Sequence, residues 1–238
     1  MRSDPQNPSR FKNLMGRYSQ NVKNKGSQKY IQKLINFNAP LINQKITEVF
    51  NFKKNLNIDW FSPLINDHYA EYRDEDFLNR LGLDSLNISL KKFWPSGGPQ
   101  WDALAMGDGN IFLVEAKSYI GEILSPPSGA KNPASLKLIN KSLSETKSFV
   151  GSKTVVDWSS YFYQYTNRIA HLYFLRELSK ENAFMVFIYF LSDNSVNGPE
   201  TKEEWLGAIS IVKKYLGINQ NKLSPFIRDI FIDVKELK

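Results

Sequence analysis

The feature that most constrains this chain is an Asp-Gly turn between two largely apolar segments. Residues 101–106 and 111–117 have the composition of paired strands, and Gly107-Asp108-Gly109-Asn110 joins them. A central Asp-Gly dipeptide between such segments is among the strongest short-range signals for a β-hairpin. We therefore predict that the chain folds around an antiparallel hairpin at residues 101–117.

The position of the turn fixes which residues of the hairpin face each other. A turn at 107–110 places Asp102 opposite Glu115, whichever turn length is assumed. Opposed side chains project to one face of the sheet with Cβ atoms about 4.5–5.5 Å apart. Lys117 lies two residues beyond Glu115 and emerges on the same face. We expect the three charged groups to converge on one point.

Two carboxylates that face each other need a positive partner, because buried charges are costly unless they are paired or bound to metal. A Mg²⁺ or Mn²⁺ ion is one solution, with Asp102, Glu115 and the carbonyl of Ala116 as ligands. The chain has no cysteine and only two histidines, which excludes thiolate and histidine-rich metal sites. The alternatives are a buried ion cluster without metal, or a polar end of the sheet that faces solvent.

The remaining segments indicate a mixed α/β protein. Apolar spacing and helix-ending residues predict helices at 29–50, 66–81, 135–149, 158–178 and 202–216. Extended apolar segments predict further strands at 87–94, 183–191 and 226–234. Three consecutive strands followed by helical connections favour a mixed sheet flanked by helices. With 42% hydrophobic residues, we expect one domain at 29–238.

The net charge of +7 is concentrated in two segments. Residues 1–29 carry seven bases against one acid, and residues 117–153 carry six lysines against two acids. We expect residues 1–28 to form a basic, mobile arm and residues 117–157 to form a basic connection. Both would contact a nucleic-acid backbone, the second through Lys131, Lys137, Lys141 and Lys147. The alternative is a solvated tail and a solvated loop.

The sequence gives no indication of a membrane partner. The longest apolar segment, 183–191, is too short to cross a bilayer, and the first ten residues lack the apolar stretch of a signal peptide. We expect a cytoplasmic protein.

The hairpin residues resemble the motif of a known enzyme superfamily. Pro99-Gln100-Trp101-Asp102 followed by Val114-Glu115-Ala116-Lys117 is similar to the signature of the PD-(D/E)XK phosphodiesterases, which include restriction endonucleases, repair nucleases and Holliday-junction resolvases. The predicted elements at 66–195 also resemble the superfamily's core of a helix, three strands, a helix and a strand. The helix predicted at 202–216 and the strand predicted at 226–234 are an extra helix and strand beyond that core. The proline departs from the pattern, because it lies three positions before Asp102 rather than next to it.

The resemblance implies further site residues outside the hairpin. Family members often carry an acid on the helix before the sheet, and the spacing of Glu71 from Leu78 places Glu71 on the side facing the sheet. The acids that follow it fit a solvated helix face better. Gln164-x-x-x-Arg168 resembles a motif that lies beside the metal centre in several families, which implies an active-site Gln164 and an Arg168 that binds a phosphate or an acid. His171 is more typical of a helix histidine with local hydrogen bonds.

The resemblance implies a Mg²⁺- or Mn²⁺-dependent nuclease with a restriction-endonuclease-like fold, acting on DNA and as an endonuclease rather than an exonuclease. Lys117 lies beside two carboxylates, so its ammonium should stay protonated and stabilise negative charge rather than act as a base. Many relatives act as dimers, and a homodimer is therefore expected. The alternative is a nuclease-like fold that binds nucleic acid or assembles with partners without turnover.

Overall fold

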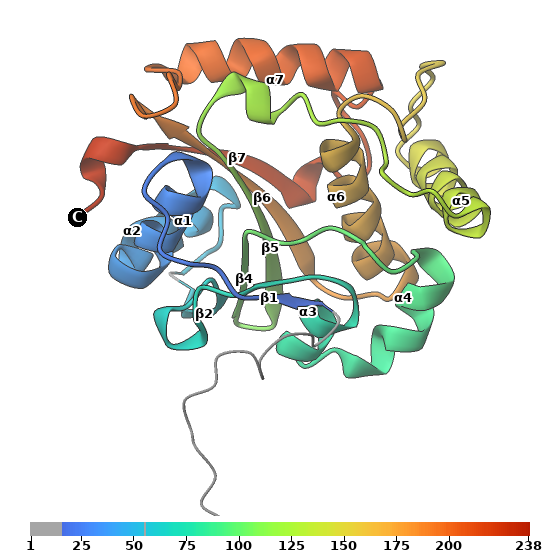
Figure 1. Cartoon of the computed structure of the whole chain (residues 1–238), viewed down its shortest axis with the longest axis horizontal. Helices are drawn as coiled ribbons and strands as arrows, with labels where there is room; N and C mark the ends of the chain where they lie inside the picture. Colours follow the sequence, from blue (N-terminus) through green and yellow to red (C-terminus); the bar gives the residue numbers. More distant parts are fainter. Residues whose placement is uncertain (1–15, 55) are drawn as a thin grey trace, which may run out of the picture.

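A five-stranded mixed sheet forms the centre of the structure, with helices on both of its faces (Figure 1). The computed structural model describes residues 16–54 and 56–238. The strands lie in the order β2 (Ile58–Ser62), β4 (Ala103–Gly107), β5 (Asn110–Lys117), β6 (Ala183–Leu191) and β7 (Ile227–Asp233). Strands β2, β4 and β5 are antiparallel neighbours, whereas β6 and β7 run parallel to β5. The mixed α/β sheet predicted from the sequence is confirmed.

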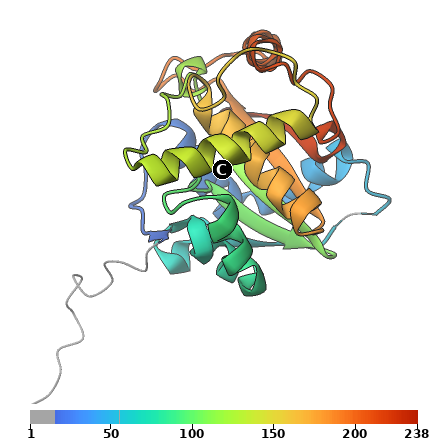
Figure 2. The same ribbon diagram turned by 90° about the vertical axis from the view of Figure 1, so that its right-hand side faces the viewer.

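Helices cover the two faces of the sheet unequally (Figures 1 and 2). One face packs against α1 (Gly26–Phe37) and α2 (Ala39–Val49). The other face packs against α3 (Asp74–Arg80), α4 (Asn87–Phe93), α5 (Pro133–Phe149), α6 (Tyr163–Tyr173) and α7 (Lys202–Leu216). Helix α6 continues into a π-helical turn at Phe174–Leu178, and short 3-10 turns occupy Ile65–Asp67, Asp84–Leu86, Ile120–Glu122, Ser224–Phe226 and Val234–Glu236.

Strand β5 separates two hydrophobic cores by the alternation of its side chains. Phe112 and Val114 point into the core beneath α1 and α2. Ile111 and Leu113 point into the larger core on the opposite face. Because successive residues of a strand face opposite sides, Glu115 lies on the same face as Ile111 and Leu113, under the larger helical layer. This strand therefore directs a charged side chain into an otherwise apolar layer.

The predicted strand at 87–94 is wrong, because these residues form α4. Leu90 and Phe93 are buried on one side of this helix at a spacing of three residues, which is helical rather than alternating. The third antiparallel strand is instead β2, which precedes the predicted segment and which the sequence analysis missed.

The predicted helix at 66–81 is also wrong over its first half. Only Asp74–Arg80 is α-helical, and Glu71–Tyr72 form β3, which pairs with β1 (Arg17–Tyr18) in a small second sheet. The predicted helix at 29–50 is interrupted at Asn38, and Pro40 lies in the first turn of α2, where a proline is tolerated.

The two basic segments contain regular structure. Strand β1 and the start of α1 lie within the expected arm at 1–28, of which residues 1–15 lie outside the described residues. The connection at 117–157 contains α5, which begins where the Asn132 side chain accepts hydrogen bonds from two backbone N–H groups. Among the described residues, no helix combines the length and apolar character that crossing a bilayer requires.

Candidate active site

The hairpin has the register that its turn predicts. Gly107 pairs with Asn110 and Ala103 pairs with Val114. Asp102 directly precedes β4, and its Oδ2 accepts a hydrogen bond from the backbone N–H of Ala116 at 2.7 Å. The Asp102 carboxylate therefore reaches across to β5 beside Glu115.

Glu115 is the centre of a buried ion cluster, with 3% of its surface exposed. Its Oε1 accepts a hydrogen bond from Lys117 Nζ at 2.5 Å. Its Oε2 lies 2.7 Å from Arg168 Nε and 2.6 Å from Arg168 Nη2. Burial alone would raise the pKa of Glu115, but the positive charges of Arg168 and Lys117 outweigh it and lower the pKa below its usual value. Glu115 is therefore an ionised carboxylate with a cation on each oxygen.

Arg168 projects from α6 and directs its donors into the protein. Its Nη2 donates to the carbonyl of Gln100 at 2.8 Å, and its Nη1 donates to Asn167 Oδ1 at 2.8 Å. The guanidinium also lies 5.0 Å from the ring centre of Trp101. Of the two partners expected for Arg168, a phosphate or an acid, the structure places it on an acid.

Lys117 bridges the hairpin and α6. Besides its contact with Glu115, its Nζ donates to Gln164 Oε1 at 3.0 Å. Burial lowers the pKa of this lysine, but the charges of Glu115 and Asp102 act more strongly together and raise the pKa above its ordinary value. The ammonium is therefore protonated, as the sequence analysis predicts from its two acidic neighbours.

Glu71 joins the same cluster from β3 rather than from a helix, which corrects the predicted element but keeps the residue beside the hairpin. Its carboxylate accepts hydrogen bonds from three side-chain amides, those of Gln100, Gln20 at 3.4 Å and Gln28 at 3.3 Å. Burial raises the pKa of Glu71, the Gln100 hydrogen bond opposes this, and the charge of Glu115 raises it further.

The three glutamines were not identified in the sequence analysis as site residues. Gln100 lies within the motif that includes Asp102, which is a signal that could have found it. Gln20 and Gln28 come from the amino-terminal segment and the start of α1, and no local pattern connects them to the hairpin.

The pKa of Asp102 indicates that negative charge exceeds positive charge around this carboxylate. Burial raises its pKa well above the ordinary value, and the charges of Glu115 and Glu71 raise it further. Among the described residues, three carboxylates thus face two cations in direct contact with the cluster, Lys117 and Arg168, while Lys23 acts on Glu71 only as a weaker influence. A divalent ion with oxygen ligands would remove this imbalance, because Mg²⁺ and Mn²⁺ prefer hard oxygen donors. The donor set of Asp102 and Glu115 fits such an ion in charge and chemistry.

The cluster leaves little free space for a metal ion. Within residues 16–54 and 56–238, no group of three or more histidine, cysteine, aspartate or glutamate side chains converges as a metal site. Both oxygens of Glu115 already contact cations. The cavity beside Glu115, Lys117 and Gln164 has a volume of only about 20 Å³, room for about one water molecule. Glu115 would have to exchange one partner to bind a metal.

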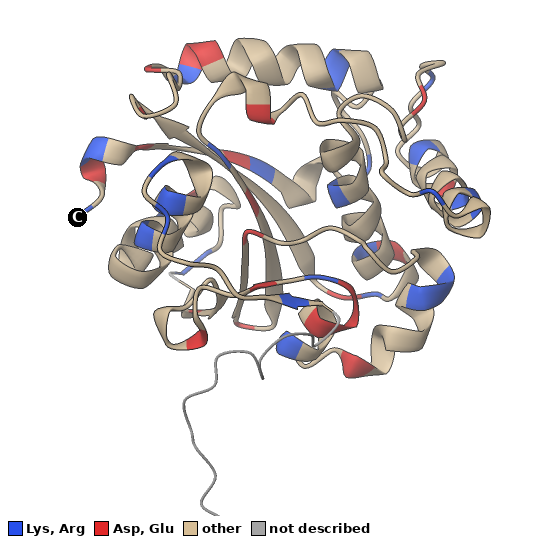
Figure 3. Cartoon of the chain, viewed as in Figure 1, with Lys and Arg blue, Asp and Glu red and all other residues tan. Residues whose placement is uncertain are grey.

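The four lysines expected to bind nucleic acid fall into two groups. Lys131, Lys137 and Lys141 are exposed on α5 or just before it. Figure 3 shows several basic positions along α5. Lys147 is half-buried and donates to the carbonyl of Val156 at 2.6 Å, so it holds the chain after α5 rather than facing solvent.

His171 lies one turn beyond Arg168 on α6 and has the local hydrogen bond expected of a helix histidine. Its Nδ1 lies 2.9 Å from the carbonyl of Asn167. Burial is the main cause that lowers the pKa of His171 to about 3, so the ring is neutral at physiological pH.

The site is thus a largely buried cluster of three carboxylates, a lysine and an arginine, assembled by one hairpin, the short strand β3 and helix α6. Comparisons with models of known protein families, with curated proteins and with solved structures found no match.

Proposed function

We propose that this protein is a Mg²⁺- or Mn²⁺-dependent nuclease that hydrolyses phosphodiester bonds of DNA, acting as an endonuclease. The observation that supports this most is the convergence of Asp102, Glu115 and Lys117 on one face of a hairpin. A carboxylate pair short of positive charge beside a protonated lysine is a suitable arrangement for phosphoryl chemistry.

Each residue has a defined task in this proposal. Asp102 and Glu115 would hold the divalent ion, with the Ala116 carbonyl as a further ligand, and the ion would supply activation of a water molecule and polarisation of the scissile phosphate. Lys117 stabilises the negative charge that develops on the phosphoryl oxygens. Gln164 holds the Lys117 ammonium in place by the hydrogen bond from Nζ.

Glu71 and Arg168 support the centre from either side. Glu71 adds negative charge that strengthens attraction for a divalent ion, and its three amide partners keep the carboxylate fixed. Arg168 orients Glu115 through two contacts to Oε2. On metal binding, Glu115 would give up part of this pairing while the arginine stays anchored to the Gln100 carbonyl.

The finer fold assignment is part of the same proposal. An antiparallel set of three strands followed by a helical crossover to a parallel strand, here β2, β4, β5 and β6, resembles the restriction-endonuclease-like core. A homodimer that cuts both strands of a duplex and a cytoplasmic location complete the proposal.

A second candidate is a nuclease-like module that binds nucleic acid without cleaving it. One observation favours it: both oxygens of Glu115 contact cations, and the cavity beside them holds only about 20 Å³. In this alternative the cluster is a structural ion network and the exposed lysines of α5 supply the binding.

Cleavage assays with matched variants separate the candidates. Plasmid and single-stranded DNA are incubated with Mg²⁺ and wild type, Asp102→Asn, Lys117→Ala or the exposed-surface control Glu203→Gln. We expect cleavage by wild type and the control, and a loss of at least about a hundredfold in the two site variants, in the range seen for essential electrostatic groups. Tight binding without cleavage by wild type would favour the module. Equal cleavage by all four proteins would refute the proposed site.

A further inference from the structure

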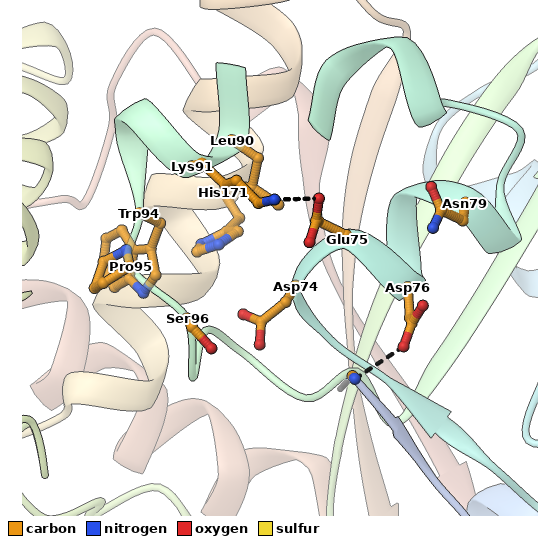
Figure 4. Close-up of a pocket in the computed structure, with 11 residues that line it drawn as sticks. Asp74, Glu75, Asp76, Asn79, Leu90, Lys91, Trp94, Pro95, Ser96 and His171 are labelled. Atoms are coloured by element: carbon orange, nitrogen blue, oxygen red, sulfur yellow. Dashed lines mark hydrogen bonds and ion pairs between the residues drawn. The ribbon is translucent and has the colours of Figure 1, made fainter. Parts of the chain in front are cut away.

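A cavity of about 540 Å³ lies away from the hairpin, between α3, α4 and α6 (Figure 4). Its walls include acids from the first turn of α3, the aromatic Trp94 and the buried His171. It is large enough for a small organic group. None of its lining residues belongs to the carboxylate cluster proposed for catalysis.

His171 brings an unused hydrogen-bond acceptor to this cavity. The Asn167 carbonyl can only accept, so Nδ1 must carry the proton of the neutral ring and Nε2 must carry a lone pair. Only 1% of the His171 surface is exposed, and among the described residues Nε2 has no hydrogen-bond partner. The ring lines the cavity beside Trp94, with their ring centres 4.9 Å apart (Figure 4). Because His171 lines the cavity, a hydrogen-bond donor that enters the cavity can reach this free acceptor.

The rest of the polar lining also consists mostly of acceptors. Asp74 accepts hydrogen bonds from the N–H groups of Gly97 at 3.0 Å and Gly98 at 2.8 Å, one on each oxygen, so each oxygen retains further lone-pair capacity. The adjacent acids Glu75 and Asp76 line the same cavity.

Two cations approach these acids. Lys91 Nζ lies 2.7 Å from Glu75, and Arg73 Nε lies 3.5 Å from Asp74. Within residues 16–54 and 56–238, three carboxylates therefore face two cations, and Figure 3 shows acids gathered on α3. The cavity is negative on a chain whose net charge is +7.

We propose that this cavity binds a guanidinium group, presented either by a small arginine-like molecule or by an arginine side chain of a partner. A guanidinium is planar, always charged and rich in N–H donors, so it can donate to Asp74 and to His171 Nε2 at the same time. The indole of Trp94 offers an aromatic surface, which guanidinium groups favour. A phosphate-bearing ligand is disfavoured because it would meet three carboxylates. This inference does not depend on the proposed nuclease activity.

Calorimetric titration of the full chain with three probes tests the ligand chemistry. Agmatine and a capped Gly-Arg-Gly peptide carry the guanidinium, and citrulline replaces it with a neutral urea of nearly the same shape. We expect one-to-one binding of agmatine, the peptide or both, with citrulline at least about tenfold weaker, equivalent to about 1.4 kcal/mol. Binding of agmatine alone indicates a small-molecule site, and binding of the peptide alone indicates a protein partner. Citrulline binding as tight as agmatine, or no binding of either guanidinium probe, would overturn the proposal.

Two variants and one spectroscopic measurement assign the binding to this cavity. Asp74→Asn should weaken agmatine or peptide binding about tenfold and Glu75→Gln about threefold, whereas Glu203→Gln on α7 should leave it unchanged. Because Asp74 also anchors the loop at Gly97 and Gly98, the second readout uses wild type: the ¹⁵N chemical shift of His171 Nε2 should move on saturation. A static Nε2 shift, or equal affinity in all variants, refutes the assignment.

Discussion

The buried pair of Arg168 and Glu115 gives the sharpest test of how the cluster is held together. Arg168→Met removes the guanidinium and keeps an unbranched apolar side chain of similar length. Only 5% of the Arg168 side chain and 3% of the Glu115 side chain are exposed, so bulk water has little access to the place of the lost partner. Oε2 of Glu115 would lose both of its contacts, at 2.7 and 2.6 Å.

The size of the effect follows from charge and burial. Two unit charges about 4 Å apart attract by about 4 kcal/mol at an effective dielectric constant near 20. Removing one partner of a buried ion pair costs about 3–5 kcal/mol, because the other charge stays buried. We therefore expect Arg168→Met to lower the free energy of unfolding by about 3–5 kcal/mol at pH 7.

Urea denaturation of wild type and variant, followed by circular dichroism, measures this change. Lys141→Met is the matched control, because Lys141 pairs with Glu145 at 3.8 Å on the exposed side of α5, and such pairs contribute at most about 0.5 kcal/mol. Adding Glu115→Gln to Arg168→Met should recover part of the loss, since it removes the stranded charge. If Arg168→Met loses less than about 1 kcal/mol of unfolding free energy, or if the double variant recovers none of the loss, the interpretation of Glu115 as a buried carboxylate paired with Arg168 is refuted.

Two further predictions concern pH and salt. The pKa of His171 falls to about 3 on folding, so between about pH 6.5 and pH 3 the unfolded chain binds a proton that the folded chain does not. The free energy of unfolding should therefore decrease as pH falls through this window, by up to about 1.4 kcal/mol per pH unit. Denaturation measured across this range should show a shallower slope in His171→Gln, and an unchanged slope would contradict the assignment. Replacing Lys131, Lys137 and Lys141 together by alanine should reduce the slope of log affinity for DNA against log salt concentration by about 0.9 for each lost phosphate contact. Fluorescence anisotropy at several salt concentrations measures this slope, and an unchanged slope would exclude α5 from the interface.

The hairpin could be predicted from the sequence because its signals are local. The Asp108-Gly109 turn and the apolar segments on either side specify both the pairing and the face on which Glu115 emerges. The position of the carboxylates relative to Lys117 then follows from strand geometry alone. This part of the candidate site needed no knowledge of the rest of the fold.

The errors arose where distant segments decide the local structure. Glu71 and Tyr72 are extended because they pair with Arg17 and Tyr18, more than fifty residues earlier in the chain. Their sequence has no alternating apolar pattern that would indicate a strand. Strand β2 was missed for a related reason, because it lies at the sheet edge, where half-buried positions such as Trp60 weaken the alternation.

The contacts that hold the site residues in place could not be predicted from the sequence either. Gln20 and Gln28 reach Glu71 only after the amino-terminal segment and α1 have packed beside β3. Glutamines in polar segments are too common to suggest such a role. Arg168 was identified through a resemblance, whereas its contact with Glu115 depends on how α6 lies over the sheet.

The mixed pairing of β5 has a consequence for how the protein folds. On one side β5 joins β4 through a tight turn, and on the other it joins β6, which follows more than sixty residues later. Local pairing closes quickly and distant parallel pairing slowly, so β4 and β5 should associate before α6 and β6 arrive. On that order of events, Glu115 and Lys117 would stay hydrated until α6 brings Arg168 over the sheet. The carboxylate would then lose its water only when its strongest counter-charge arrives.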